Sequence, residues 1–146
     1  MKTKLITTAV AAFLSFTLLA QEPSKAPESA GPDAKIITKL TEIVQFREQL
    51  VEIEEALYQS GRASAENGSG VELAEIALAE SRADLAHEQG KREGLIAALQ
   101  DLVSAHEKRV KWAQNMKNIA RASDVEIKQA QVELLKAQVR LLREQK

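Results

Sequence analysis

The stretch IITKLTEIVQFREQLVEIEEALY, residues 36–58, decides the fold of this chain. An isoleucine or a leucine returns in it every seven residues, at Ile36, Ile43, Leu50 and Leu57. A seven-residue apolar repeat lines up these side chains on one side of a helix, and such a helix packs against a partner helix. The stretch therefore predicts one helix of a coiled coil.

Apolar side chains recur at helical spacing in the rest of the chain as well. Near the C-terminus, three valines alternate with two leucines, at Val125, Val132, Leu135, Val139 and Leu142. The middle of the chain gives a third series: Leu95, Leu99, Leu102, Val103, Val110, Ala113 and Met116. No proline follows Pro32, and no long stretch alternates apolar and polar residues as a strand does. The sequence therefore predicts an all-α fold, an elongated antiparallel coiled coil.

Two segments interrupt the helical pattern, at residues 61–70 and 118–124, and each ends in or is followed by the sequence Ser-x-Val-Glu. In a capping box of this kind, the serine hydroxyl accepts a hydrogen bond from the backbone N–H three residues on. The glutamate side chain accepts one from the serine N–H. We therefore expect four helix-capping residues: Ser69, Glu72, Ser123 and Glu126.

The two interruptions also match each other, because GRAS at 61–64 parallels ARAS at 120–123. We interpret this match as an internal duplication of a helix–turn–helix unit. It predicts helices at about 35–60, 71–119 and 123–146. The middle helix, at about 75 Å, is long enough for the two short helices to stack end to end along it. The two turns would then lie at opposite tips.

Gly90 and Gly94 fall near the middle of the predicted long helix. Glycine weakens a helix but does not have to end it. We interpret the pair as a tolerated weak point in a continuous helix, and a bend at this place is the alternative.

The first residues have the features of a secretory signal peptide. Two lysines near the start precede an apolar run that ends at Ala20 and is too short to span a bilayer comfortably. We expect residues 1–20 to direct export and to be cleaved after Ala20; an uncleaved N-terminal anchor is the alternative. Residues 21–34 contain all three prolines and predict a flexible linker before a helical domain at 35–146. Without cysteine, the exported chain relies on no disulfide.

Residue types that carry catalysis or bind metals are sparse. His87 and His106 are far apart, and neither belongs to a zinc motif such as H-E-x-x-H. His106 shares a helical column with Leu99 and Ala113, so we expect it at a helix seam. The turn serines are explained as caps rather than nucleophiles. We therefore expect no catalytic residue, no cofactor, no metal site and no enzymatic activity.

The formal net charge of −1 argues against nucleic-acid binding, which needs a basic face. Two basic clusters remain: residues 108–111, and the series Lys136, Arg140, Arg143 and Lys146. We attribute the second cluster to the favourable position of cations near a helix C-terminus, with contact to an anionic surface as the alternative. We expect Trp112 to cover a helix interface; on an exposed face it would anchor a partner.

The segment from Met116 to Leu142 resembles the helix–turn–helix of TolC-type outer-membrane efflux proteins. The residues that carry the resemblance are Ser123, Asp124, Val125, Ala130, Leu134, Ala137 and Leu141. Ala120 stands where that family usually has glycine, whereas Gly61 and Ser64 keep the pattern in the first copy. The membrane-spanning β-strands of the family are missing, so this chain cannot form the outer-membrane pore alone. The resemblance implies a helical segment whose turns meet other helical hairpins, through Arg62, Ser64, Arg121, Ser123 and Asp124.

We therefore expect a non-enzymatic periplasmic coiled-coil protein, associated with the outer membrane, that acts in envelope transport or scaffolding by helix–helix contacts. Its expected partners are proteins, including the hairpins of efflux adaptors, together with further copies of itself in a homo-oligomer. No nucleic acid and no small-molecule substrate is expected. The alternative is a periplasmic holdase chaperone of the Skp kind, which also uses helical arms after a signal peptide. A weaker alternative is an anchored accessory to an enzyme.

Overall fold

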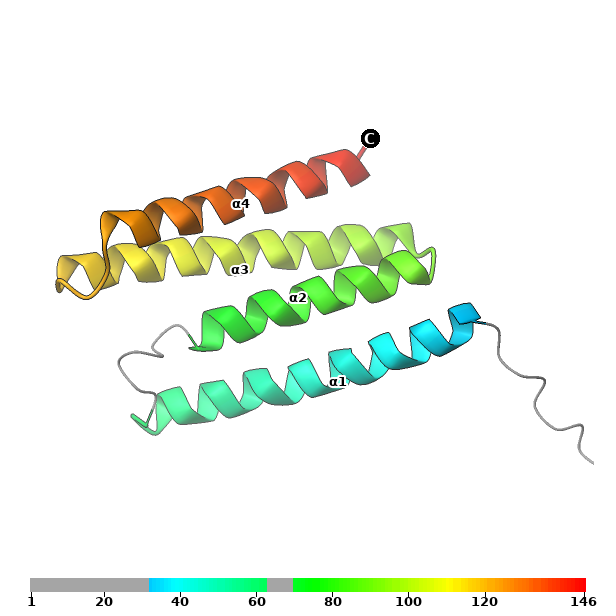
Figure 1. The fold of residues 1–146 in the computed structure, drawn as a ribbon, viewed down its shortest axis with the longest axis horizontal. Helices are drawn as coiled ribbons and strands as arrows, with labels where there is room; N and C mark the ends of the chain where they lie inside the picture. The colour runs from blue at the N-terminus through cyan, green and yellow to red at the C-terminus, as the bar shows by residue number, and fades with distance from the viewer. Residues whose placement is uncertain (1–31, 63–69) are drawn as a thin grey trace, which may run out of the picture.

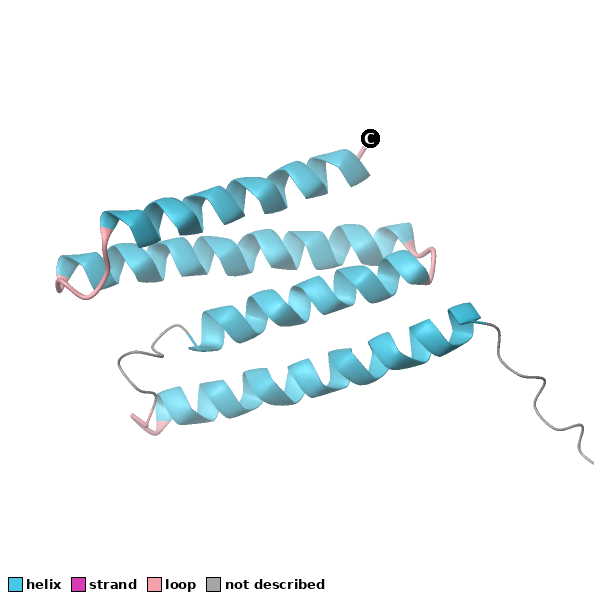
Figure 2. Cartoon of the chain, in the orientation of Figure 1, coloured by secondary structure: helices cyan, strands magenta, loops and turns pink. Residues whose placement is uncertain are grey.

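The computed structural model describes residues 32–62 and 70–146. These residues form four helices and no strand (Figures 1 and 2): α1 (Pro32–Gln59), α2 (Gly70–Glu88), α3 (Arg92–Asn118) and α4 (Asp124–Glu144). The all-α prediction is confirmed. The expected signal peptide, most of the expected linker, Ser64 and Ser69 lie outside the described residues.

Helix α1 begins at Pro32, within the segment predicted to be a linker. Proline suits the first helical position because the N–H that it lacks would have no partner inside the helix there. Asp33 follows in the first turn, where a negative charge favours the helix dipole. The linker prediction for 21–34 is therefore too long at its C-terminal end.

The predicted long helix from 71 to 119 is wrong, because the chain turns back at residues 89–91 and forms α2 and α3 instead. Gly90 has a φ of +63°, in the left-handed region that glycine enters without strain. Its N–H donates to the carbonyl of His87 at 2.9 Å, and the N–H of Lys91 donates to the carbonyl of Ala86 at 2.9 Å. These two bonds close α2 with a Schellman motif. Gly90 is thus a helix end, neither a weak point nor a bend.

The same motif ends α1 and α3. Gly61 has a φ of +68°, and the N–H after it, from Arg62, donates to the carbonyl of Leu57 at 3.0 Å. Ala120 has a φ of +56°, and the N–H of Arg121 donates to the carbonyl of Met116 at 2.8 Å. Ala120 therefore holds a backbone conformation that favours glycine.

Each helix packs against the next one in the chain, and α1 and α4 do not touch. Figure 1 shows successive helices running in opposite directions, with α1 and α4 at the two edges of a row. The C-terminal end of α1, the start of α2 and the α3–α4 turn consequently lie at one end of the row, and the α2–α3 turn lies at the other. The prediction of two short helices stacked end to end, with turns at opposite tips, is therefore wrong.

The core lies where α2, α3 and α4 meet. Its buried members are Ala79, Ala83, Ala86, Leu95, Ala98, Leu99, Leu102 and Ala137. Five of these eight are alanines, whose small side chains let helices approach closely; leucines of α3 fill the remaining space. The apolar series that the sequence shows in the middle of the chain is thus largely an interior seam.

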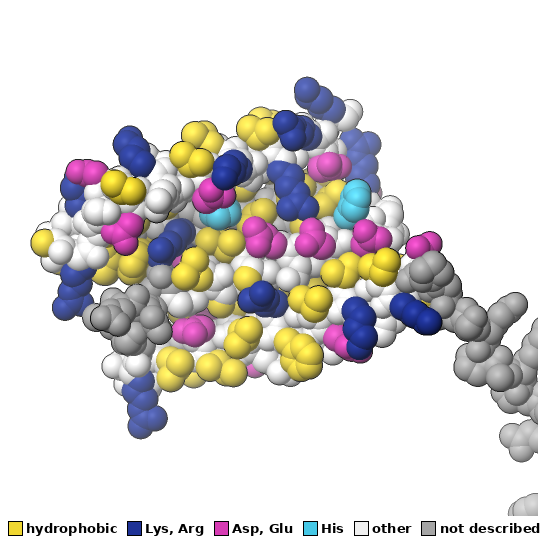
Figure 3. All heavy atoms as spheres, viewed as in Figure 1, with side chains coloured by type: hydrophobic (Ala, Val, Ile, Leu, Met, Phe, Trp, Pro, Cys, Tyr) yellow, Lys and Arg dark blue, Asp and Glu magenta, His cyan; other side chains and the backbone are white. Residues whose placement is uncertain are grey.

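The other two apolar series face outward from the row. On α1, the exposed residues are Ile36, Ile43, Phe46, Leu50, Ile53 and Leu57, which we call the α1 stripe. On α4, they are Val125, Val132, Leu135, Val139 and Leu142, which we call the α4 stripe. No residue of α1 from Asp33 to Gln59 is fully buried, although Val51 lies beside Leu78 and Ala79 of α2. Figure 3 shows hydrophobic side chains along both edges of the molecule.

Ion pairs join neighbouring helices across this row. Arg82 of α2 contacts Glu48 of α1 at 2.9 Å, and Lys108 of α3 contacts Glu75 of α2 at 2.5 Å. Three of these four side chains are exposed enough that each pair contributes little to stability. The pairs fix which faces meet, whereas apolar packing supplies most of the stability.

The reversal at Gly90 can be tested with an inverse pair of substitutions. Gly90→Ala puts a Cβ on a left-handed residue and should lower the free energy of unfolding by about 1 kcal/mol. Ala120→Gly removes the same strain from the α3–α4 turn and should raise the free energy of unfolding by about as much. Urea unfolding followed by circular dichroism measures both.

Gly94→Ala is the matched control, because Gly94 lies within α3 and an added Cβ would meet Ala86 Cβ at an ordinary 3.6 Å. This substitution should stabilise the protein by about 0.5–1 kcal/mol, as alanine does within a helix. If residues 71–119 formed a continuous helix, Gly90→Ala would stabilise as well, and that result would contradict the turn.

Candidate functional site

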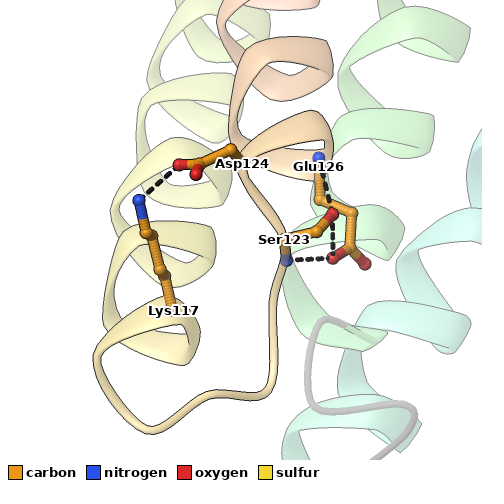
Figure 4. A network of polar contacts seen from close by, with 4 residues as sticks. All are labelled: Lys117, Ser123, Asp124 and Glu126. Atoms are coloured by element: carbon orange, nitrogen blue, oxygen red, sulfur yellow. Dashed lines mark hydrogen bonds and ion pairs between the residues drawn. The ribbon is translucent and has the colours of Figure 1, made fainter.

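The α3–α4 turn is held at its exit by a capping box (Figure 4). The hydroxyl of Ser123 accepts a hydrogen bond from the backbone N–H of Glu126 at 3.2 Å, and the N–H of Ser123 donates to the Glu126 carboxylate at 2.6 Å. The Ser123 hydroxyl also donates to the same carboxylate, at 3.0 Å. The two bonds that the carboxylate accepts, from the N–H and from the hydroxyl of Ser123, favour its ionised form, so the pKa of Glu126 is lowered. The box fixes the residue at which the chain enters α4.

An ion pair closes the same turn from the other side. The Lys117 ammonium, in the last turn of α3, donates to the carboxylate of Asp124, the first residue of α4. This hydrogen bond and the positive charge of Lys117 lower the pKa of Asp124. Asp124 is exposed, so the pair orients the turn and adds little to the stability of the fold.

Two of the predicted contact residues, Arg62 and Arg121, are exposed and directly follow the C-terminal turns of α1 and α3. These two helix ends lie at the same end of the row (Figure 1). Each arginine directly follows the left-handed residue of a Schellman motif, Gly61 or Ala120. Their backbone positions are fixed because both N–H groups bond to the preceding helix. The structure thus places together two residues that sequence analysis assigned to opposite tips.

The first connection is described only in part. Glu72 lies in the first turn of α2, half-buried, and α2 begins at Gly70. A cap at Ser69 would precede this start directly, but Ser69 lies outside the described residues. The second capping box therefore stays a prediction, as does a contact at Ser64.

Behind the α3–α4 turn, the guanidinium of Arg109 lies over the ring of Trp112, 4.4 Å from its centroid. Burial lowers the pKa of Arg109, and the charges of Glu72 and Glu126 partly offset this effect. The contact between Arg109 and Trp112 was not predicted from the sequence. Their spacing of three residues on one helix is the signal that predicts such a contact.

The two basic clusters are largely used within the protein. In the first, Lys108 pairs with Glu75, and Arg109 covers Trp112. In the second, Lys136 pairs with Glu133 at 2.7 Å, and Arg140 pairs with Asp84 at 3.3 Å. These contacts neutralise much of the charge that an anionic surface would need to bind.

His106 is the one buried polar residue of the described chain, in α3. Burial lowers its pKa, and the negative charges of Glu80 on α2 and Glu133 on α4 oppose that effect. Its place between helices agrees with the expectation of a seam position. His87, in contrast, is exposed near the end of α2.

A hollow of about 230 Å³ lies beside α1, α2 and α3, between residues that include Val51, Glu75 and Ser104. This volume is below the range of roughly 300–1,000 Å³ that is usual for ligand pockets. Glu75 is already paired with Lys108 there. Within the described ranges, no group of three or more histidine or acidic side chains could hold a metal ion.

Comparison with protein-family models, with curated proteins and with solved structures finds no match to this chain. None of the helices in residues 32–62 and 70–146 is long and apolar enough to cross a membrane. The exposed features of the described residues are the capped turn with its arginines and the two apolar stripes.

Removing the cap should loosen the α3–α4 turn. Ser123→Ala eliminates the acceptor for the Glu126 N–H and should lower the free energy of unfolding by about 1 kcal/mol. Hydrogen exchange at the first amides of α4 should rise, while exchange in the middle of α3 stays slow. Ser123→Asp, which also caps helices, is the control and should restore protection; a failure to do so would contradict the cap.

His106 should make stability depend on pH in the mildly acidic range. Because its pKa is lowered in the folded chain, the unfolded chain binds more protons below about pH 6.5, so stability falls as the pH drops through that value. The free energy of unfolding should decrease between about pH 7.5 and about pH 5.5, and His106→Gln should flatten this slope. His87→Gln is the matched control. Equal slopes for wild type and His106→Gln would exclude this role.

Proposed function

We propose that this protein is a non-enzymatic scaffold of the cell envelope that acts by helix–helix contacts. One observation carries the proposal: both edge helices expose apolar stripes at heptad spacing. Phe46 is 63% exposed, and Val125 is 64% exposed. Apolar side chains that continue along a whole helix are unusual on a monomer and mark a contact surface. The seven-residue spacing of the stripes suits another helix better than a flat or globular partner.

The packing of the four helices is interpreted as an antiparallel coiled coil. Small residues such as Ala83 and Ala98 line its interior, and charged pairs such as Arg82–Glu48 border the helix contacts. This geometry favours a spacer over an enzyme, because the hollow beside the helices is small and three of its charged groups, Glu75, Arg82 and Lys108, are held in ion pairs. A scaffold needs contact faces, and the exposed apolar stripes of α1 and α4 support this role.

The capped turn offers a second, more polar contact. Arg62 and Arg121 share one end of the row, where other helical hairpins could meet them. The proposal places the protein in the periplasm beside the outer membrane, because of the signal-peptide features of residues 1–20 and the TolC-like pattern of residues 116–142. Hairpins of efflux adaptor proteins are the partners that this pattern suggests.

A holdase chaperone is the second candidate, and the exposed aromatic residues favour it. Phe46 is 63% exposed and Tyr58 is 65% exposed, so α1 could bind apolar segments of an unfolded client. A scaffold that uses heptad contacts should discriminate between partners, whereas a holdase should not. An aggregation assay with an unfolded outer-membrane protein separates these two activities.

The proposal can be tested with a photo-crosslinking amino acid placed at Arg121 in the full chain and expressed in cells. We expect adducts to a small number of exported helical proteins, identified by mass spectrometry. The same amino acid at Lys91, exposed in the turn at the opposite end of the row, is the matched control and should give few adducts.

Two outcomes would contradict the scaffold. One is an adduct pattern at Arg121 that matches the pattern at Lys91. The other is suppression of client aggregation at stoichiometric amounts of the protein, which would favour the holdase. Arg121→Glu should weaken capture of a specific partner and leave the helical content unchanged, because the exposed Arg121 side chain belongs to a turn.

A further inference from the structure

We propose that the two stripes cover each other between copies of this chain, with the α1 stripe of one copy packed in the opposite direction on the α4 stripe of the next. The inference rests on the helix–helix contacts of the proposed function and names one partner, a second copy. Within one chain the two stripes cannot meet, because α2 and α3 lie between α1 and α4.

The stripes have the same heptad layout. In α1, the first position of successive heptads begins at Ile36, and Phe46 and Ile53 occupy the fourth position. In α4, the first position begins at Val125, and Leu135 occupies a fourth position. Each layout therefore offers the alternating side chains that interlock in a coiled-coil seam. By its number of residues, α1 is about 42 Å long and α4 is about 32 Å long. The α1 helix of one copy can therefore cover nearly all of the α4 stripe of the next.

One lysine that shares the heptad positions of each stripe sets the direction. Lys39 and Lys128 both occupy the earliest fourth position of their heptads. Parallel helices in register would place these two ammonium groups in the same layer, where they repel. Antiparallel helices, with Ile43 opposite Leu135, place Lys39 opposite Val139 and Lys128 opposite Leu50. Each lysine then lies against an aliphatic side chain, and its ammonium group can reach solvent.

The charges of the two edge helices favour an α1–α4 contact over an α1–α1 contact. Helix α1 carries six acidic and three basic side chains, whereas α4 carries four of each. Two α1 helices side by side would bring two acidic surfaces together, which disfavours a symmetric α1–α1 pair. Pairing α1 with the neutral α4 avoids this repulsion.

A single type of contact, between α1 and α4, also covers the apolar stripes at both edges of the row. Each copy offers one α1 edge and one α4 edge, so the contact repeats from copy to copy and either closes into a ring or extends. The antiparallel direction continues the alternation seen inside each chain in Figure 1. A symmetric α4–α4 pair would leave the α1 stripe, with Phe46, in water.

The absence of cysteine allows a direct test with single-cysteine variants of the full chain. Ile43→Cys and Leu135→Cys are purified separately, mixed, and treated with a short bis-maleimide. We expect a covalent two-chain product only in the mixture. Product from Ile43→Cys alone or from Leu135→Cys alone would show symmetric pairing and overturn the proposal. Gln45→Cys, exposed on another face of α1, is the matched control for Ile43→Cys and should give little product with Leu135→Cys.

Sedimentation provides the second measurement. The full chain should sediment above its monomer mass of 16.0 kDa, and Phe46→Glu should reduce the mass about twofold or more. Gln45→Glu adds the same charge on another face of α1 and should leave the mass unchanged. Circular dichroism checks the fold of both variants, and 63% exposure of Phe46 predicts that helicity is kept. A monomeric wild type overturns the proposal.

The two proposals fail separately. A monomeric wild type that still forms adducts from Arg121 in cells would remove the pairing of stripes and leave the scaffold. Specific two-chain products from the cysteine variants, without partner adducts at Arg121, would remove the scaffold and leave self-association.

Discussion

The left-handed backbone of Gly90 is the constraint on which the arrangement of this protein depends. A right-handed conformation there would let α2 continue into α3 as one helix, and the apolar faces of both would point to partners far apart. With the reversal, the leucines of α3 fold back on the alanines of α2, and the interior forms within a single hairpin. The edge helices then add to a core that already exists.

The same reversal determines which surfaces remain for partners. It brings Arg62 and Arg121 to one end of the row, and it leaves α1 and α4 on opposite edges. In a long-helix arrangement, α1 and α4 would each pack on the central helix, and their apolar stripes would be covered inside one chain. In the observed row, each edge helix uses one face for its neighbour and keeps its stripe exposed.

Helix content, the position of the α3–α4 turn and the start of α4 could all be predicted from sequence. Proline-free heptads indicate helices, and Ser123 with Glu126 marks a helix start. The α2–α3 turn could not be predicted, because the start of α3 lacks a capping sequence. Lys91 is the N-cap of α3 and makes no side-chain capping bond. A lone glycine within a helical pattern is ambiguous until the tertiary contacts on both sides decide it.

The exposed surfaces could likewise be predicted from the sequence only in part. Spacing along a helix shows which side chains share a face, so both stripes could be recognised from the sequence. Spacing does not show whether the partner helix belongs to the same chain, and none of the four described helices covers Phe46 or Leu135. The contact between Arg109 and Trp112 could have been predicted from the sequence, since the two residues are about one helical turn apart.

The described helices make close backbone contacts only with the helices next to them in the chain, and this has a consequence for how the chain folds. Nearly every close backbone contact joins segments that a short connection separates, so closing those loops costs little conformational entropy. Topologies of this kind fold in roughly microseconds to milliseconds, without slow long-range pairing. A hairpin such as α2–α3 can form before the remaining helices are in place. The molecule can then grow outward from it, one helix at a time on each side.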